Sequence, residues 1–460
     1  MIHTHNNPQH VSKDSELGLV ESKHVVNTPD VNEWKRQRRH ITDAFLPQTV
    51  MTKFVPKLTY MAQAMVNNWK TELQGNNNTA EIDVRSWMHH TALAMFVNCM
   101  MGDDRAFSKP YENPTANDLN IFANYEDDLD FADTTPINSI APRSLFNLEG
   151  VGGGNLSPKE AEQRFNKIIS YALKLFTRGA QRGENNQQVG PLLERLMELE
   201  ENEVKLSNML ATLVAGHDTT AYTMQYCLME LARNPDLQTR ARAEVNKLYD
   251  EIEREGRELQ FSDIPRFEFV TKCICETLRL WNVATSVFPR VTSFDDVIIG
   301  KNGEDIDIPK GTKFTFWYYG QHHSEELWGD DVMKYNPDRE WQPEELQRSP
   351  DPNSPLLGTS VTPCTERFHP FSLPTRDCVG KNFALTEMRV LIPFILRNFY
   401  LEIPNNSELK FVQPLYDNKV FYDWAHKIGG PVQPHVLKLK VTPIDLIGSS
   451  ESAKKVISRL

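Results

Sequence analysis

The segment "FHPFSLPTRDCVGKNFALTE", residues 368–387, constrains this chain most, because it places a single cysteine between a Pro- and Thr-containing turn and a helical run. A cysteine at a helix N-terminus lies where unpaired backbone N–H groups and the positive end of the helix dipole favour the thiolate over the thiol. The sulfur of Cys378 is therefore predicted to act as a nucleophile or as a metal ligand.

The length and composition predict one large globular domain. The chain has 460 residues, of which 40% are hydrophobic and 24% are charged, and this is ample for a large core and excludes a disordered or collagen-like chain. No Pro-, Ser- or Gly-rich linker separates two independently patterned halves, and no internal repeat occurs. We expect a flexible lead over residues 1–24 and one domain over residues 25–460.

The charge and the cysteine content exclude two classes of protein. Lys and Arg total 50 against 62 Asp and Glu, and the net charge of −12 argues against nucleic acid as a partner. The six cysteines are sparse and lack paired zinc-finger spacing, which fits a reducing compartment. Most of them are predicted to be buried thiols, including Cys273 and Cys275, which lie two apart on a helix and do not face each other.

No targeting segment is expected. The first residues are polar and lack an apolar h-region, and the longest apolar runs, "MLATLVAG" and "VLIPFIL", are too short to cross a bilayer. We therefore expect neither a signal peptide nor a membrane anchor in this chain.

The periodicity predicts a mainly α fold with a small β portion. Helical patterns cover residues 32–45, 86–100, 157–180 (with Ser157 as N-cap) and 206–233. Strand patterns cluster late, in "DDVIIG", "DIDIPKGTKFTFWYYG", "FYLEI" and "VLKLKVTP", with turns at Gly303 and Gly311. The glycine-rich run at 150–155 is predicted to be a loop, because no Lys-Ser or Lys-Thr follows it.

The segment "AGHDTTAYT", residues 215–223, lies inside the long predicted helix. Gly216 weakens the helix, and the hydroxyls of Thr219 and Thr220 can bond carbonyls one turn back, so the helix is expected to open into a groove. Asp218 beside Thr219 would then place an acid and a hydroxyl where a proton could be passed. The alternative is an ordinary helix with a solvated Asp.

Two further segments combine opposite or complementary groups on one helix face. Glu276 and Arg279 in "ETLRL" can pair, and their apolar flanks predict a buried ionic knot that needs a further partner such as Arg339. Trp34 and Arg38 in "WKRQRR" place an apolar plate beside a guanidinium, which suits a flat anionic ligand. The alternative for the second segment is an ordinary basic surface.

Taken together, these segments resemble the cytochrome P450 superfamily of haem-thiolate monooxygenases. The chain carries "WKRQRR", "AGHDTT", "ETLR", "NPDREW" and "PFSLPTRDCVG" in the order of that superfamily. The resemblance extends from about Val25 onward and implies the cytochrome P450 fold. It is greater to the eukaryotic, reductase-served members than to soluble bacterial ones.

The resemblance implies a role for individual residues. Cys378 would be the proximal thiolate ligand of the iron of haem b (iron protoporphyrin IX), with Phe371 packed beside the sulfur. Asp218 and Thr219 would deliver protons to oxygen during catalysis, and Ala215 and Gly216 would line the oxygen pocket. The haem propionates would contact Trp34, Arg38, Arg290 and Arg376, and the structural triad behind the ligand loop would be Glu276, Arg279 and Arg339.

The resemblance also implies partners. We expect NADPH-cytochrome P450 reductase or a similar electron donor, O2, and a small hydrophobic substrate. Docking of the donor on the Cys378 side would use Arg367, Lys381 and Arg389. The implied location is the endoplasmic-reticulum membrane or a cytosol-facing site.

Two departures from the family pattern leave alternatives open. Pro374 stands where the family usually has Gly, and "WKRQRR" begins at residue 34 without the usual preceding anchor, sheet and helices, so an N-terminally truncated fold is expected. The alternatives are an inactive or haem-deficient paralogue and a haem-thiolate isomerase that rearranges peroxides. A zinc protein that uses Cys364, Cys378, His322 and His323 is a third alternative, without ligand spacing to support it.

Overall fold

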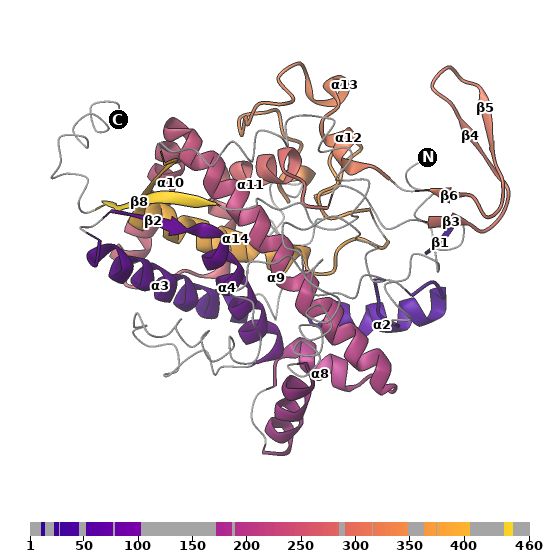
Figure 1. Cartoon of the computed structure of the whole chain (residues 1–460), viewed down its shortest axis with the longest axis horizontal. Coiled ribbons are helices and arrows are strands. Elements are labelled where there is room, and N and C mark those ends of the chain that lie inside the picture. Colours follow the sequence, from indigo (N-terminus) through magenta and orange to yellow (C-terminus); the bar gives the residue numbers. More distant parts are fainter. Residues whose placement is uncertain are drawn as a thin grey trace, which may run out of the picture.

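The fold is helical around one long central helix, as seen in a computed structural model of the chain (Figure 1). The structure describes residues 11–13, 23–26, 28–45, 52–76, 79–102, 172–185, 189–284, 290–314, 316–347, 363–373, 375–404 and 437–444. Pro374, Ser157 and residues 150–155, on which predictions were made, lie outside these ranges. The predicted class, mainly α with a small β portion, is confirmed.

Helices make up most of the elements that the structure defines. They are α2 (Val31–Asp43), α3 (Thr52–Gln74), α4 (Val84–Phe96), α8 (Pro191–Met197), α9 (Asn202–Arg233), α10 (Pro235–Arg254), α11 (Glu268–Leu280), α12 (Tyr318–His322), α13 (Glu325–Trp328) and α14 (Lys381–Asn398). A π-helical segment, Val97–Met101, continues α4, and two 3₁₀ segments cover Phe261–Arg266 and Pro343–Leu346.

Helix α2 shows how the sequence sets a local structure. Asp30 caps it, because the Asp30 carboxylate accepts a hydrogen bond from the Glu33 N–H at 2.7 Å. The buried residues Trp34, Gln37 and Ile41 recur every three or four positions and so form one face. That face packs inward, while the basic residues between them are exposed or half-buried.

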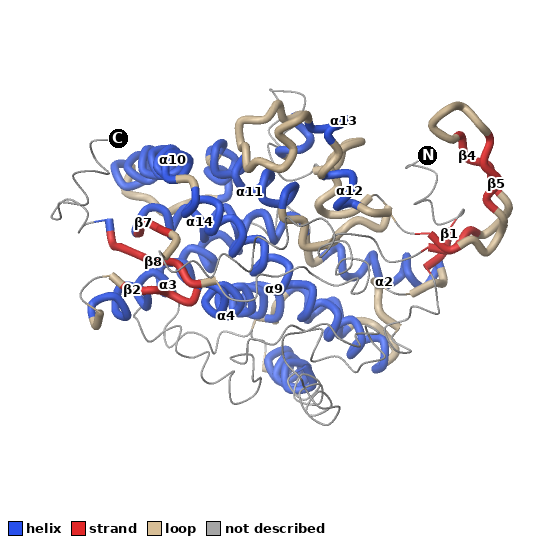
Figure 2. Tube along the Cα trace, turned by 45° about the horizontal axis from the view of Figure 1, so that its top comes forward, coloured by secondary structure: helices blue, strands red, loops and turns tan. Residues whose placement is uncertain are grey.

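The strands form three small antiparallel sheets. One sheet has the order β1-β3-β6 (Val11–Lys13, Arg290–Thr292, Lys313–Phe314), the second has the order β2-β8-β7 (Ala80–Asp83, Lys438–Pro443, Phe399–Glu402), and the third is the hairpin β4-β5 (Asp296–Ile299, Asp305–Ile308). Strand β1 lies within residues 1–24, the predicted flexible lead, and its three residues pair with β3. The hairpin and the β2-β8-β7 sheet lie at opposite ends of the molecule (Figures 1 and 2).

The strand predictions were right in place for β4, β5, β6, β7 and β8. The turns at Gly303 and Gly311 are also present, and both glycines have positive φ values, 84° and 86°. One extension was wrong: the aromatic run after Phe316 forms helix α12 and not a continued strand.

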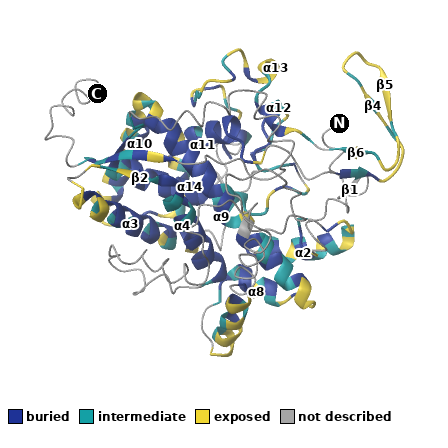
Figure 3. Cartoon of the chain, viewed as in Figure 1, coloured by how far each residue is buried: buried dark blue, intermediate teal, exposed yellow. Residues whose placement is uncertain are grey.

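The core lies where α3, α4, α9, α11 and α14 meet (Figure 3). Helix α9 crosses the molecule, and α4 lies along it, while α14 packs against α3 and α10 (Figures 1 and 2). No helix among the described residues combines the length and the apolar composition that crossing a membrane requires.

Candidate functional site

The segment that precedes α14, residues 363–373 and 375–380, is called the cysteine loop, and it presents Cys378 just ahead of α14. The backbone N–H of Cys378 donates to the Phe371 carbonyl at 2.8 Å, and Gly380, two residues on, is the N-cap of α14. The Cys378 thiol is exposed, whereas Cys99, Cys227, Cys273 and Cys275 are buried, as predicted for most of the cysteines. Cys378 is therefore the thiol best placed to meet a ligand among the described residues.

The environment of Cys378 corrects one expectation. The surrounding protein desolvates the sulfur and raises the pKa of the Cys378 thiol, although the Gly380 N–H, Lys381 and Arg38 act in the opposite direction. Cys378 is exposed as a residue, yet the protein packed around its thiol disfavours the charge. The helix terminus therefore does not by itself favour the thiolate, and a cation bound at the open face would be needed to do so.

A group of arginines lies beside the cysteine loop. The Arg376 guanidinium stacks over the Trp34 ring at 4.3 Å from its centroid, and Arg376 Nη1 donates to the Thr28 carbonyl at 3.2 Å. Burial, and then the positive charges of Arg290 and Arg38, lower the pKa of Arg376 to about 10. These side chains, which lie far apart in the sequence, are thus brought together by the fold.

The arginine group fits an anionic ligand. Arg38 donates to the carbonyl and the carboxylate of Asp377 at 2.6 and 2.8 Å, and Lys381 shares that carboxylate at 2.8 Å. Arg376 Nη2, in contrast, is buried without a hydrogen-bond partner in the described structure. A buried guanidinium nitrogen left open beside two more arginines matches the carboxylates of haem propionates, and the exposed Cys378 sulfur matches the iron.

The central segment of α9 departs from the predicted groove. Helix α9 is continuous through it, and the Thr219 hydroxyl donates to the Ala215 carbonyl at 3.1 Å. Gly216 is needed for packing, because a Cβ there would lie 2.3 Å from the Phe96 ring of α4. Ala215 is exposed and Thr219 is half-buried, so this face of α9 stays partly open.

Asp218 lies on a different face of α9 from Thr219, because successive helical residues point about 100° apart. Its buried carboxylate lies 3.0 Å from His217 Nε2 and 3.4 Å from Nδ1 of His89 on α4. Although burial opposes the effect, His217 and then His89 hold the pKa of Asp218 well below its usual range. Asp218 is therefore ionised, and the proton associated with it resides on a histidine partner.

His89 and His217 were not predicted as partners of Asp218. Although burial again opposes it, the Asp218 carboxylate raises the pKa of His217. His217 adjoins Asp218 in the sequence, but His89 reaches it only because α4 packs along α9. Two histidines in succession in "WMHHTA" were the available sequence signal.

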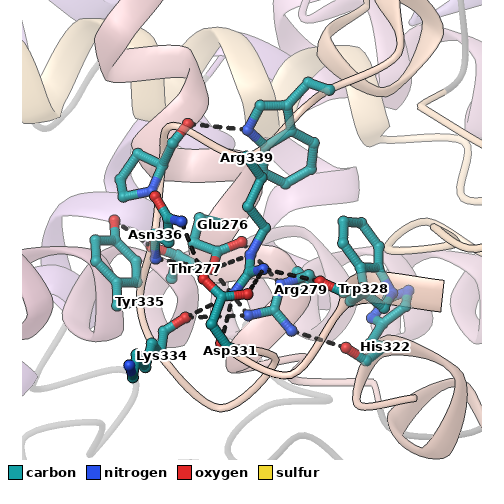
Figure 4. A network of polar contacts seen from close by, with 12 residues as sticks. Glu276, Thr277, Arg279, His322, Trp328, Asp331, Lys334, Tyr335, Asn336 and Arg339 are labelled. Atoms are coloured by element: carbon teal, nitrogen blue, oxygen red, sulfur yellow. Dashed lines mark hydrogen bonds and ion pairs between the residues drawn. The ribbon is translucent and has the colours of Figure 1, made fainter. Parts of the chain in front are cut away.

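The structure brings Glu276, Arg279 and Arg339 into one buried network (Figure 4). Arg279 donates twice to the Glu276 carboxylate, both at 2.8 Å, and Arg339 Nε donates to the same carboxylate at 2.9 Å. Both side chains of the Glu276–Arg279 pair are 0% exposed. Asp331 pairs with Arg339 at 2.5 Å, so two carboxylates balance two guanidiniums.

This network extends to the cysteine loop through His322. Arg279 donates to the His322 carbonyl at 2.8 Å, and the His322 Nε2 atom accepts from the His369 N–H at 2.9 Å. His322 Nδ1 is engaged by Asn282 at 3.1 Å. Both ring nitrogens are thus occupied, which removes His322 as a ligand and, with it, the support for a zinc site with Cys364 and Cys378.

The predicted cationic docking surface is wrong for one of its three residues, and the structure weakens the case for the other two. Arg389 is buried and bonds Gln347 and Thr271 at 2.9 and 3.1 Å. Arg367 donates to Glu345, and Lys381 pairs with Asp377, so each already has a carboxylate partner.

Comparison with known proteins shows that the chain is similar to cytochromes P450. The family model described as cytochrome P450 matches residues 2–416. Cytochrome P450 4F8 of Homo sapiens is 26% identical over 82% of this chain and 68% of its own length. Cytochrome P450 4F6 of Rattus norvegicus is 35% identical over 42% of this chain. Cytokinin hydroxylase of Arabidopsis thaliana is 29% identical over 54% of this chain and 44% of its own length.

The aligned region covers only part of the length of several of these relatives. The chain covers 32% of the length of cytochrome P450 4F6 and of the leukotriene-B4 omega-hydroxylase 3 of Mus musculus, to which it is 36% identical. The family match nevertheless spans most of the chain and includes both α9 and the cysteine loop. The chain belongs to the cytochrome P450 family.

Proposed function

We propose that this chain is a haem-thiolate monooxygenase that inserts one oxygen atom of O2 into a small hydrophobic substrate. Electrons would come from NADPH through NADPH-cytochrome P450 reductase or a similar donor. The observation that carries the proposal is the exposed Cys378 sulfur ahead of α14, beside a buried Arg376 nitrogen that lacks a partner in the described structure. Membership of the cytochrome P450 family supports it.

Cys378 would bind the iron of haem b, and bound haem would supply the iron that activates O2, with thiolate ligation favouring O–O cleavage. Arg376, Arg38 and Arg290 would neutralise the propionates, while Trp34 fixes the Arg376 plane. Phe371 would cover the sulfur. The open face of α9 at Ala215 would border the oxygen pocket, and Gly216 would line it next to the Phe96 ring.

Asp218 and Thr219 would together control the proton supply. The Thr219 hydroxyl is half-buried and already donates to a backbone carbonyl, so its oxygen can accept a hydrogen bond from a donor on the open face. The Asp218 carboxylate would stabilise a proton on His217 Nε2, which lies 3.0 Å from Asp218 Oδ1. General acid assistance of this kind is typically worth about 10²–10⁴ in rate.

The substrate class is proposed from the relatives and the apolar character of the surroundings. The names of leukotriene-B4 omega-hydroxylase 3 and of cytokinin hydroxylase describe hydroxylation. Met209 and Leu213 on α9 are apolar and buried on the same helix as Thr219. A small hydrophobic molecule is therefore the substrate that this chain would accept.

The chain would work at the endoplasmic-reticulum membrane, facing the cytosol. Its resemblance to the reductase-served members supports this location. Cell fractionation with the chain tagged at its C-terminus would test it, and recovery outside the microsomal fraction would contradict it.

The haem assignment is tested by removing single thiols. Reduced wild-type protein under carbon monoxide should show the far-shifted Soret band of a thiolate-ligated haem, and Cys378→Ala should abolish that band. Cys364→Ala is the matched control, because Cys364 lies on the same loop but bonds His369 Nδ1 at 3.3 Å. If only the control loses the band, Cys378 is not the ligand. A wild-type chain without haem would favour the haem-deficient paralogue.

The proton role is tested at Thr219. Thr219→Ala should keep haem, substrate binding and electron uptake but should divert reduced oxygen to hydrogen peroxide, because the hydroxyl that positions a proton donor is lost. The measurement is the ratio of peroxide to hydroxylated product per NADPH consumed with reductase present. Thr219→Ser retains the hydroxyl and serves as the control. An unchanged ratio in Thr219→Ala would remove the residue from the proposed mechanism.

A further inference from the structure

Helices α4 and α9 bring three metal-ligating side chains together away from the cysteine loop. His89 comes from α4, and His217 and Asp218 come from α9. One ligand atom from each residue lies within 4.8 Å of the other two. Imidazole nitrogens and a carboxylate oxygen are donors that borderline divalent metals accept.

We propose that His89, His217 and Asp218 bind one divalent transition-metal ion, and that Zn²⁺ is the ion that suits this donor set. Two histidines and one carboxylate, with a fourth position left to water, are a known zinc arrangement in proteins. The site is distinct from the cysteine loop in both its residues and its elements.

The distances suit such an ion. Ligand atoms about 2.0–2.2 Å from a tetrahedral metal lie roughly 3.4 Å from one another. Asp218 Oδ1 lies 3.4 Å from His89 Nδ1 and 3.0 Å from His217 Nε2. Binding would therefore require His217 and Asp218 to separate by a few tenths of an ångström. It would also require the two histidine ligand atoms, which lie within 4.8 Å of each other, to take a similar spacing by side-chain rotation.

The ring of His217 is already oriented for ligation. His217 Nδ1 lies 2.6 Å from the Leu213 carbonyl, so that nitrogen carries the proton and Nε2 is left to face Asp218. A backbone carbonyl that fixes the second ring nitrogen is the usual outer partner of a ligating histidine, because it sets both tautomer and orientation. The rigidity of α9 holds this arrangement in place.

The charges around the site also allow a metal. The Asp218 carboxylate lies between the two imidazoles and would supply the negative charge that a divalent ion requires. A metal ion would compete with the proton that His217 and Asp218 share, and binding would displace that proton. The His89 side chain is 17% exposed, which gives an ion a route from solvent to an otherwise buried group.

Metal binding would withdraw Asp218 from proton supply, and this consequence rests on the proposed function. A zinc ion on Asp218 Oδ1 replaces the proton that the carboxylate holds through His217. Zinc would then uncouple NADPH consumption from product formation without touching Cys378. The site would thus act as an inhibitory metal site in the oxygenase.

The test measures bound zinc and needs no turnover. The full chain is dialysed against Zn²⁺, separated from free metal, and analysed for zinc by elemental mass spectrometry. We expect one zinc per chain above background in the wild type and in His90→Gln, a control on the same helix next to His89. We expect that zinc to be absent in His89→Gln and Asp218→Asn. Replacing an outer partner costs about 10–100-fold in affinity, so loss of a ligand should cost at least as much.

Several results would overturn the proposal. They are a wild type that holds no more zinc than His89→Gln, or a His90→Gln variant that loses as much zinc as His89→Gln. If Asp218→Asn does not fold, His89→Gln decides alone, since His89 lies at the edge of the cluster. Because zinc is counted independently of haem and of product, failure of this test leaves the haem assignment intact. A missing carbon monoxide spectrum likewise leaves the zinc result intact.

Discussion

At the residue scale, Glu387 is a buried carboxyl on α14 that the proposed chemistry does not use. It is 0% exposed, and neither carboxyl oxygen has a hydrogen-bond partner in the described structure. Burial raises the pKa of Glu387 well above its usual value, so the group is neutral in the folded protein. An unpartnered carboxyl in a core costs stability that a neutral residue of the same shape would not.

Glu387 should make the chain less stable as the pH rises. Above the ordinary Glu pKa the unfolded state ionises while the folded state stays protonated, so stability falls by up to about 1.4 kcal/mol per pH unit until the folded pKa is reached. Glu387→Gln removes this loss. Its melting temperature should therefore exceed that of the wild type by more at pH 8 than at pH 5.5. A difference that does not change with pH would show that Glu387 ionises in the fold.

The sequence indicated which residues matter but not how they meet. Cys378 and the Glu276–Arg279 pair could be predicted because local spacing determines them. The His89 partner of Asp218 and the burial of Arg389 could not, because both depend on how α4, α11 and α14 pack. Contacts between distant segments are not encoded in any short pattern.

At the element scale, the Glu276 network fixes α11 to the His322 carbonyl at the end of α12 (Figure 4), and the His322 ring in turn accepts from the His369 N–H of the cysteine loop. Glu276→Gln would leave Arg279 and Arg339 buried with one carboxylate fewer, at a cost of about 3–5 kcal/mol. We expect little haem in the purified variant, measured as the ratio of Soret to protein absorbance. Glu198→Gln is the control: it breaks the Glu198–Arg195 pair, which is also three residues apart but whose side chains are 41% and 39% exposed. Equal haem content in both variants would contradict a structural role for Glu276.

The sequence predicted the position of an element correctly where its secondary-structure propensity and its tertiary packing agreed. The alternation in "VLKLKVTP" predicted β8, and the inward residues Leu439 and Val441 are buried as that alternation requires. The aromatic run at Tyr318 has equal strand propensity, yet it forms α12. In α12, Tyr318 packs with Leu373 of the cysteine loop, so a tertiary contact and not strand propensity determines the local structure.

At the scale of the whole molecule, strand β1 connects the start of the chain to the arginine group. Its Lys13 pairs with Arg290 in β3, and β3 pairs on its other side with β6. Deletion of residues 1–13 should leave β3 as an edge strand, loosen Arg290 and speed haem loss, because ladder hydrogen bonds worth about 0.5–1.5 kcal/mol each disappear. Transfer of haem to an acceptor globin measures the rate. Deletion of residues 1–10 keeps β1 and is the control; equal rates in the two deletions would contradict the role of the strand.

The hairpin β4-β5 reaches away from the body, and its apolar residues meet solvent (Figures 1 and 3). Val297 and Ile299 are 52% and 68% exposed, and they lie directly opposite Asp307 and Asp305 in the pairing register. A projecting two-stranded ribbon offers unpaired edges to another copy, which is how soluble chains begin to aggregate. The two carboxylates stand on the same face as the valine and the isoleucine. Self-stacking of that face would desolvate them, and colloidal stability at high concentration therefore depends on these two aspartates.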